Sequence, residues 1–177
     1  VCDLCKEYFP DSVGKGFLDK RLKLIYQDGN KFLRETKEKY DVVIVDSSDP
    51  VGPNVSLFEE NFYSLIKNVL ADDGIMCTQG ENTWLHIDLI ESLLGRCKHL
   101  YPSVAYAYTC VPTYPSGQIG FVVCSKEKNL NLSIPRRAKD ITEIQSSLRY
   151  YTPLIHKSAF VLPKFANDII NNDHLHH

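Results

Sequence analysis

The sequence of 177 residues lacks the signals of membrane insertion and secretion. No apolar run approaches the roughly 20 residues that a helix needs to cross a bilayer. No basic start followed by an apolar segment and a cleavage site marks a secretory leader. With 44% hydrophobic and 24% charged residues, the composition is typical of a soluble globular protein, and we expect a cytoplasmic location.

An excess of charge of either sign is also missing. Lys and Arg number 20 against 22 Asp and Glu, and the formal net charge is -2. This balance produces no overall field that would attract nucleic acid or an anionic membrane, so the sequence indicates neither as a partner. Any preference for a charged ligand must therefore be local.

Motifs that bind metals, phosphates and dinucleotides are absent or incomplete. Cys2 and Cys5 form a C-x-x-C pair, but the other four cysteines stand singly, so a zinc site is not completed. Neither the P-loop pattern G-x-x-x-x-G-K-S/T nor the dinucleotide pattern G-x-G-x-x-G occurs, which counts against phosphoryl and hydride transfer. We expect no metal and no redox cofactor.

What the sequence does contain is an alternation of strand-like and helical segments. Tight turn residues at 113–117 join the last two strand-like runs, which predicts an antiparallel pair. The strand-like runs are 22–27, 41–46, 74–80, 103–112 and 118–125, and the helical segments are 1–9, 58–69, 85–101, 141–148 and 164–170. The run 41–46 (DVVIVD) has no polar alternation, which predicts a strand covered on both faces.

This alternation predicts an α/β fold with a Rossmann-like, mostly parallel sheet that ends in an antiparallel edge hairpin. The length favours one domain over residues 1–177. We leave the terminal residues 174–177, with their three histidines, out of the fold, because they are either native or the remnant of a purification tag.

Polar side chains follow three of the predicted strands. Asp28 follows the run 22–27, Asp46 ends the run 41–46, and Gln79 and Glu81 come at the end of the run 74–80. In open parallel sheets, ligands bind at the carboxyl ends of the strands, so we expect these side chains to share one cleft.

The residues alone leave several roles open for the acids. We interpret Asp72 and Asp73 as helix N-caps. Pro50 and Pro53 prevent a helix from starting after Asp46, so that acid and Asp49 lie in a stiff loop. There they could form Asx turns or bind an organic ammonium group. They could also bind Mg²⁺, although the neighbouring sequence does not supply the further ligands that this ion needs.

Five motifs together resemble one family, the polyamine aminopropyltransferases, and in particular its spermidine synthases. They are QDG (27–29), DSSDPVGP (46–53), QGE with Trp84 (79–84), PTYPSGQIGF (112–121) and YYTPLIHKSAFVLPKFA (150–166), and they cover almost the whole chain. The resemblance implies a methyltransferase-type sheet behind an amino-terminal β-domain, in a homodimer. It also implies aminopropyl transfer from decarboxylated S-adenosylmethionine to putrescine, which releases methylthioadenosine and needs no cofactor. The DSSDP loop favours putrescine over spermidine as the acceptor, because the spermine synthases of the family do not keep it.

The same resemblance implies a role for each matching residue. In the mechanism that it implies, a carboxylate first attracts the ammonium group and then accepts its proton. Asp46 would be this catalytic group; Asp46, Asp49, Tyr114 and Gln79 would bind putrescine; Asp28, Gly29 and Pro53 would bind the nucleoside; Glu81 would be a further contact.

Some parts of the family pattern are not in this sequence. The glycine-rich nucleoside loop of GGGDGG type, the acid for the ribose and the amino-terminal β-domain would all precede Val1. We therefore expect the sequence to be the carboxyl-terminal part of a longer chain, without the first strands of the sheet. Two other interpretations stay open: a putrescine N-methyltransferase, and a non-catalytic truncated paralogue that binds or regulates the full enzyme.

Overall fold

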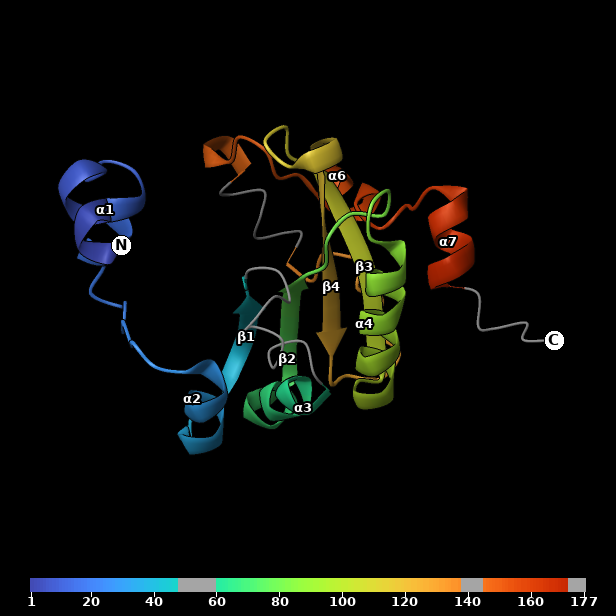
Figure 1. Cartoon of the computed structure of the whole chain (residues 1–177), viewed down its shortest axis with the longest axis horizontal. Helices are drawn as coiled ribbons and strands as arrows, with labels where there is room; N and C mark the ends of the chain where they lie inside the picture. The colour runs from blue at the N-terminus through green and yellow to red at the C-terminus, as the bar shows by residue number, and fades with distance from the viewer. Residues whose placement is uncertain (48–59, 138–144, 172–177) are drawn as a thin grey trace. The chain divides into compact units, whose positions relative to one another are not determined.

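The computed structural model describes residues 1–47, 60–137 and 145–171, and the chain divides into two compact units. The first unit is Val1–Phe32 and the second is Leu33–His177. Helix α2 (Gly29–Glu35) begins in the first unit and ends in the second (Figure 1). The expectation of one domain over residues 1–177 stays a prediction.

The first unit contains helix α1 (Cys2–Tyr8) and the 3-10 helix η1 (Val13–Leu18), so the predicted amino-terminal helix is confirmed. The two pack closely at Gly14, where an added Cβ would lie 2.6 Å from the carbonyl oxygens of Cys5 and Phe9. The predicted strand 22–27 is wrong, since the structure has no strand there. A strand needs a neighbour for its backbone groups, and the sheet is built only from strands of the second unit.

The second unit is organised around a mixed four-stranded sheet (Figure 1). Its strands are β1 (Tyr40–Val45), β2 (Leu70–Gln79), β3 (Ser103–Cys110) and β4 (Gln118–Ser125), in the order β1-β2-β4-β3. Strands β1 and β2 are parallel, whereas β4 is antiparallel to β2 and β3. The predicted α/β sheet with an antiparallel edge hairpin is confirmed.

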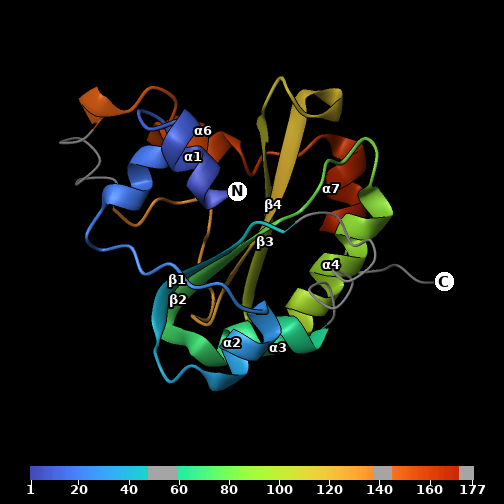
Figure 2. The same cartoon turned by 60° about the vertical axis from the view of Figure 1, so that its left-hand side comes forward.

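Helices α3 (Glu60–Val69) and α4 (Ile87–Leu100) cover one face of the sheet (Figure 2). Their apolar residues recur at helical spacing, which puts them on the side that faces the strands. Helix α7 (Lys164–Ile170) packs against α4, and α6 (Pro153–Ser158) lies over the opposite face of the sheet. The largest fully buried core side chains are Tyr63, Ile66, Leu70, Met76, Ile90, Cys97, Val122 and Cys124.

Two short 3-10 helices, η3 (Pro115–Gly117) and η4 (Gln145–Ser147), complete the described elements. Within the described part of the chain, no helix has both the length and the apolar character that a bilayer crossing requires.

Strand β1 is less covered than its apolar sequence predicts. Val43 and Val45 pack against the core, but Val42 and Ile44 are 57% and 73% exposed. Among the described elements, helices α3 and α4 cover the face on which Val43 and Val45 pack against the core, and β1 is an outer strand of the described sheet. The prediction of a strand buried on both faces is therefore wrong for these residues.

The acids between α3 and the straight part of β2 are not helix N-caps as predicted. Tyr40 of β1 pairs with Leu70 of β2, and Val42 pairs with Ile75, so two residues of β1 lie opposite five of β2. The extra residues of β2 form a bulge that contains Asp72 and Asp73. No helix begins there. The Asp72 carboxylate instead lies 3.2 Å from Nζ of Lys126.

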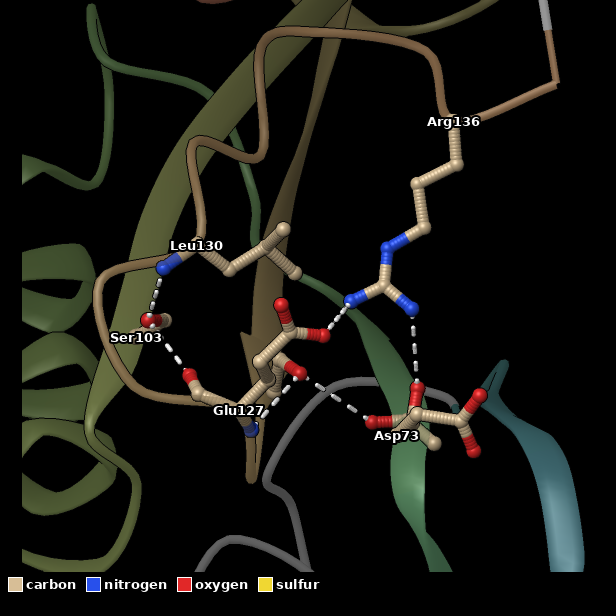
Figure 3. A network of polar contacts seen from close by, with 7 residues as sticks. Asp73, Ser103, Glu127, Leu130 and Arg136 are labelled. Carbon is tan, nitrogen blue, oxygen red and sulfur yellow. Dashed lines mark hydrogen bonds and ion pairs between the residues drawn. The ribbon is translucent and has the colours of Figure 1, made fainter.

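A polar network fixes the segment that follows β4 (Figure 3). The hydroxyl of Ser103, on β3, donates to the Glu127 carbonyl at 2.8 Å and accepts from the Leu130 N–H at 3.0 Å. Arg136 pairs with the Glu127 carboxylate and donates to the Asp73 carbonyl at 3.3 Å. The network thus joins β2 and β3 to the segment after β4 at one end of the sheet.

We predict that Ser103→Ala lowers the free energy of unfolding by about 0.5 to 1.5 kcal/mol, because it removes the part-buried hydrogen bonds to the Glu127 carbonyl and from the Leu130 N–H. Urea unfolding of the complete protein measures this loss. Ser92→Ala is the matched control, since the exposed Ser92 hydroxyl only accepts from Arg96. Equal stability of the two variants would contradict the prediction.

Candidate active site

The parallel pairing of β1 and β2 brings two of the predicted site residues together. Val45 is the register partner of Thr78, so the next residues of the two strands are Asp46 and Gln79. Neighbouring strands are about 4.8 Å apart, so these two backbones are adjacent at the carboxyl ends of their strands. The two residues thus lie at one edge of the sheet. The predicted cleft that they would share with Asp28, a residue of the first unit, stays a prediction.

Gln79 has an unusual environment. Thr78 before it faces the core, so the Gln79 side chain points to the opposite face of the sheet, away from α3 and α4. Its Oε1 atom is buried and has no hydrogen-bond partner among the described residues. A buried acceptor without a donor costs about 1 to 3 kcal/mol, so this position favours a ligand that brings an N–H group.

The turn after β2 is held in an uncommon backbone conformation. Glu81 has φ of 56°, which a non-glycine residue seldom adopts. Its carbonyl accepts from the Gly120 N–H at 2.5 Å and from the Tyr106 hydroxyl at 3.1 Å, and the Gly80 N–H donates to the Gly120 carbonyl at 2.8 Å. Burial, with a smaller effect of the Glu81 charge, raises the pKa of Tyr106, so its hydroxyl stays protonated as a donor.

The Glu81 carboxylate has a partner of its own. Oε2 lies 3.2 Å from Nδ1 of His86, and the Glu81 side chain is only 13% exposed. The buried Asn82 accepts from the N–H groups of Trp84 and Leu85 at 3.2 and 3.1 Å, which fixes the approach to α4. These contacts hold the Glu81 side chain and the turn after β2 in place.

Tyr114 lies on the link between β3 and β4. Gln79 pairs with Phe121, and β4 starts at Gln118, so this link extends past the end of β2 on the edge where Asp46 lies. The Tyr114 N–H donates to the Val111 carbonyl at 3.1 Å, and its side chain is 45% exposed. The structure thus brings Tyr114 to the same edge as Asp46 and Gln79.

Asp28 and Gly29 lie near the end of the first unit, at the start of α2. One carboxylate oxygen of Asp28 accepts from the Lys31 N–H at 2.8 Å, and its carbonyl accepts from the Phe32 N–H at 2.9 Å. Asp28 therefore caps the start of α2. A nucleoside-binding role for Asp28 and Gly29 stays a prediction.

Asp49 and Pro53 lie outside the described residues, so their predicted roles also stay predictions. Sequence reasoning missed Tyr106, His86 and Asn82, which support the turn after β2. Asn82 was recognisable as an asparagine shortly before a helical segment, where such side chains accept from backbone N–H groups. No sequence pattern indicated that Tyr106 on β3 contacts Glu81 after β2. Among the residues that the structure describes, no group of three or more His, Cys, Asp or Glu side chains has the arrangement of a metal site.

The fold is that of the methyltransferase-like α/β proteins. The human methyltransferase-like protein 13, solved with SAH, superimposes with a TM-score of 0.59 at 18% identity over 84% of this chain and 68% of its own, which shows the fold. A spermidine synthase solved with the transition-state analogue AdoDATO superimposes with a TM-score of 0.82 at 25% identity, over 96% of this chain and 57% of its own.

The family model of the spermine/spermidine synthase domain matches residues 1–134, and the chain belongs to this family. The chain is 44% identical over 172 residues to the spermidine synthase of Dictyostelium discoideum, covering 97% of this chain and 59% of that protein. It is 42% identical over 177 residues to a spermine synthase of Saccharomyces cerevisiae, again covering 97% and 59%. The chain thus spans little more than half the length of the curated relatives that it matches.

We predict that Gly120→Ala lowers the free energy of unfolding by about 1 to 3 kcal/mol, because overpacking at this contact forces the turn to shift. A Cβ there would lie 1.9 Å from the Tyr106 hydroxyl oxygen and 2.6 Å from the Glu81 carbonyl oxygen. Chemical denaturation of the complete protein measures the effect.

Gly95→Ala in α4 is the matched control, since no atom outside the backbone of that helix lies within 4 Å of its added Cβ. Alanine at this helical position is expected to raise stability by about 0.5 to 1 kcal/mol. The account of the turn fails if Gly120→Ala is as stable as the original protein.

Proposed function

We propose that the complete protein transfers an aminopropyl group from decarboxylated S-adenosylmethionine to putrescine, giving spermidine and methylthioadenosine. One observation carries the proposal: the buried Gln79 amide oxygen has no partner among the described residues and lies next in register to Asp46. An alkyl ammonium brings both the N–H donors and the positive charge that these two acceptors favour. Family membership and the likeness to a spermidine synthase solved with a transition-state analogue support the same choice.

In this proposal Asp46 is the general base. A primary amine is protonated at neutral pH, with a reference pKa of about 10.4, and only its neutral form is a nucleophile. Asp46 attracts the ammonium group and accepts its proton. The nitrogen then bonds to the carbon next to the sulfonium, and the carbon–sulfur bond breaks, with its electron pair leaving on the sulfur of methylthioadenosine. The sulfonium is already an activated leaving group, so this chemistry requires no metal or redox cofactor.

The remaining site residues bind the two substrates. The carboxylate of Asp49, the ring and hydroxyl of Tyr114 and the amide of Gln79 hold the diamine, and the second ammonium group is bound directly or through water. Asp28, Gly29 and Pro53 hold the nucleoside, for which Asp28 keeps one carboxylate oxygen beyond the one that caps α2. We further propose that the complete protein acts in the cytoplasm as a homodimer.

The reaction is tested by measuring methylthioadenosine release from decarboxylated S-adenosylmethionine, using the complete protein with putrescine or with spermidine as acceptor. We expect release with putrescine and much slower release with spermidine, because Asp49 and Tyr114 hold the far ammonium at one distance. Methyl transfer from S-adenosylmethionine to putrescine would instead identify an N-methyltransferase. No turnover of either donor, together with no heat on titration with methylthioadenosine, would favour the non-catalytic paralogue.

We predict that Asp46→Asn lowers kcat by about 10² to 10⁴ at nearly unchanged stability, because an amide cannot accept the proton. Steady-state kinetics with both substrates measure this loss. Asp41→Asn, the same change at the exposed start of β1, is the matched control and should keep full activity. Near-normal turnover of Asp46→Asn would contradict the proposed role of Asp46 as the general base.

Asp49→Asn separates binding from chemistry. We expect it to raise the KM for putrescine more than it lowers kcat, because this side chain contacts the end of the diamine that does not react. A fall in kcat as large as that of Asp46→Asn would show that the two acids do not have separate roles.

A further inference from the structure

A second concave site lies at the opposite end of the sheet from Asp46 and Gln79. It is a hollow of about 420 Å³, called here the basic pocket, within the range of about 300 to 1,000 Å³ typical of small-molecule sites. It is lined by Lys67, Lys98, His99, Leu100, Tyr101, Pro102, Lys126 and Lys128. The lining residues that the structure describes thus include four lysines and no carboxylate. Two of the lining residues, Pro102 and Lys126, flank the paired residues Ser103 at the start of β3 and Ser125 at the end of β4. This pair locates the basic pocket at that end of the sheet.

Three of these lysines are anchored to the carboxyl ends of helices. Lys67 donates to the carbonyl of Leu100, the last residue of α4, and Lys98 donates at 3.1 Å to that of Ile170, the last residue of α7. Lys126 donates at 3.1 Å to the carbonyl of Leu70, directly after α3. Free carbonyls at helix ends attract cations, which explains why lysines gather here.

Anchoring leaves these ammonium groups with unused donors. Each ammonium has three N–H groups, of which Lys67 and Lys98 use one each for the contacts above. Holding a lysine in one rotamer normally costs conformational entropy on binding, and here folding has already paid that cost. The basic pocket therefore presents fixed positive charges with N–H groups that have no acceptor among the described residues.

Capping does not account for every charge in the basic pocket. Lys128 has no carbonyl or carboxylate partner among the described residues, and His99 adds a further nitrogen group. Among the described residues, the carboxylate that pairs with a lysine of the basic pocket is that of Asp72, which lies 3.2 Å from Lys126 and is fully exposed. Exposed pairs of this kind contribute little. Four ammonium groups around one hollow repel each other, and a multiply charged anion relieves that repulsion.

We propose that the basic pocket binds a multiply charged oxyanion of the oligophosphate class, at a site separate from the strand-end site. Phosphate oxygens are acceptors only, so they match a lining of ammonium donors. Because the two sites lie at opposite ends of the strands, the bound anion does not occupy the position of the diamine. This inference does not depend on the proposed reaction.

The test is isothermal titration of sodium tripolyphosphate into the complete protein at low ionic strength. We expect saturable binding, with a dissociation constant that rises about tenfold in Lys128→Ala, as the loss of one charge-assisted contact predicts. Lys157→Ala on α6 removes the same charge outside the basic pocket and should leave binding unchanged. Added NaCl should weaken binding by screening.

Two results would overturn the proposal. One is an absence of saturable binding, and the other is an equal loss of affinity in Lys128→Ala and Lys157→Ala, which would indicate general charge attraction. Lys67→Ala adds a second comparison, because it removes both a helix-end contact and a charge of the basic pocket. Lower Tm together with weaker tripolyphosphate binding supports the site, whereas lower Tm with unchanged binding means that the lysines only cap helices.

Discussion

The parallel register of β1 and β2 is the constraint on which the candidate site depends. Because Val45 pairs with Thr78, the strands end side by side, and the residues that follow are a carboxylate and an amide. A shift of one residue would turn Gln79 toward the apolar core and separate it from Asp46. The core holds the register, since Met76 and Thr78 of β2 are buried beneath α3 and α4. The chemistry proposed at the strand ends therefore rests on apolar packing along the strands.

The antiparallel hairpin supplies the second support. Strand β4 places Gly120 against the turn after β2, where any side chain would collide with the Tyr106 hydroxyl. That hydroxyl and the Gly120 N–H both donate to the Glu81 carbonyl, which holds the residue at positive φ. The same hairpin carries Tyr114 past the end of β2. One structural element thus fixes the shape of the site and contributes a side chain to it.

Much of this arrangement was predictable from local patterns, and the exceptions have physical reasons. The end of an apolar β-branched run located Asp46, and the rule for parallel strands joined it to Gln79. The run 22–27 has equally good strand residues, but pattern alone does not supply a partner strand, and the structure has no strand there. Tyr106 was missed because its contact with Glu81 joins segments 25 residues apart, a distance that no periodicity reports. Asp28 was predicted as a site residue because it follows the strand-like run 22–27, whereas in the structure its carboxylate accepts from the Lys31 N–H and caps α2.

The central claim is that the Gln79 amide oxygen, which has no partner among the described residues, and the carboxylate of Asp46 form a receptor for an ammonium group. The most direct measurement is isothermal titration of putrescine into the complete protein saturated with methylthioadenosine, compared with the Gln79→Met variant, which keeps the length of the side chain and removes the acceptor. The account predicts a dissociation constant raised about tenfold or more in the variant, since a hydrogen bond to a charged group contributes about 1.5 to 3 kcal/mol. Equal affinity for putrescine in the two proteins would contradict it.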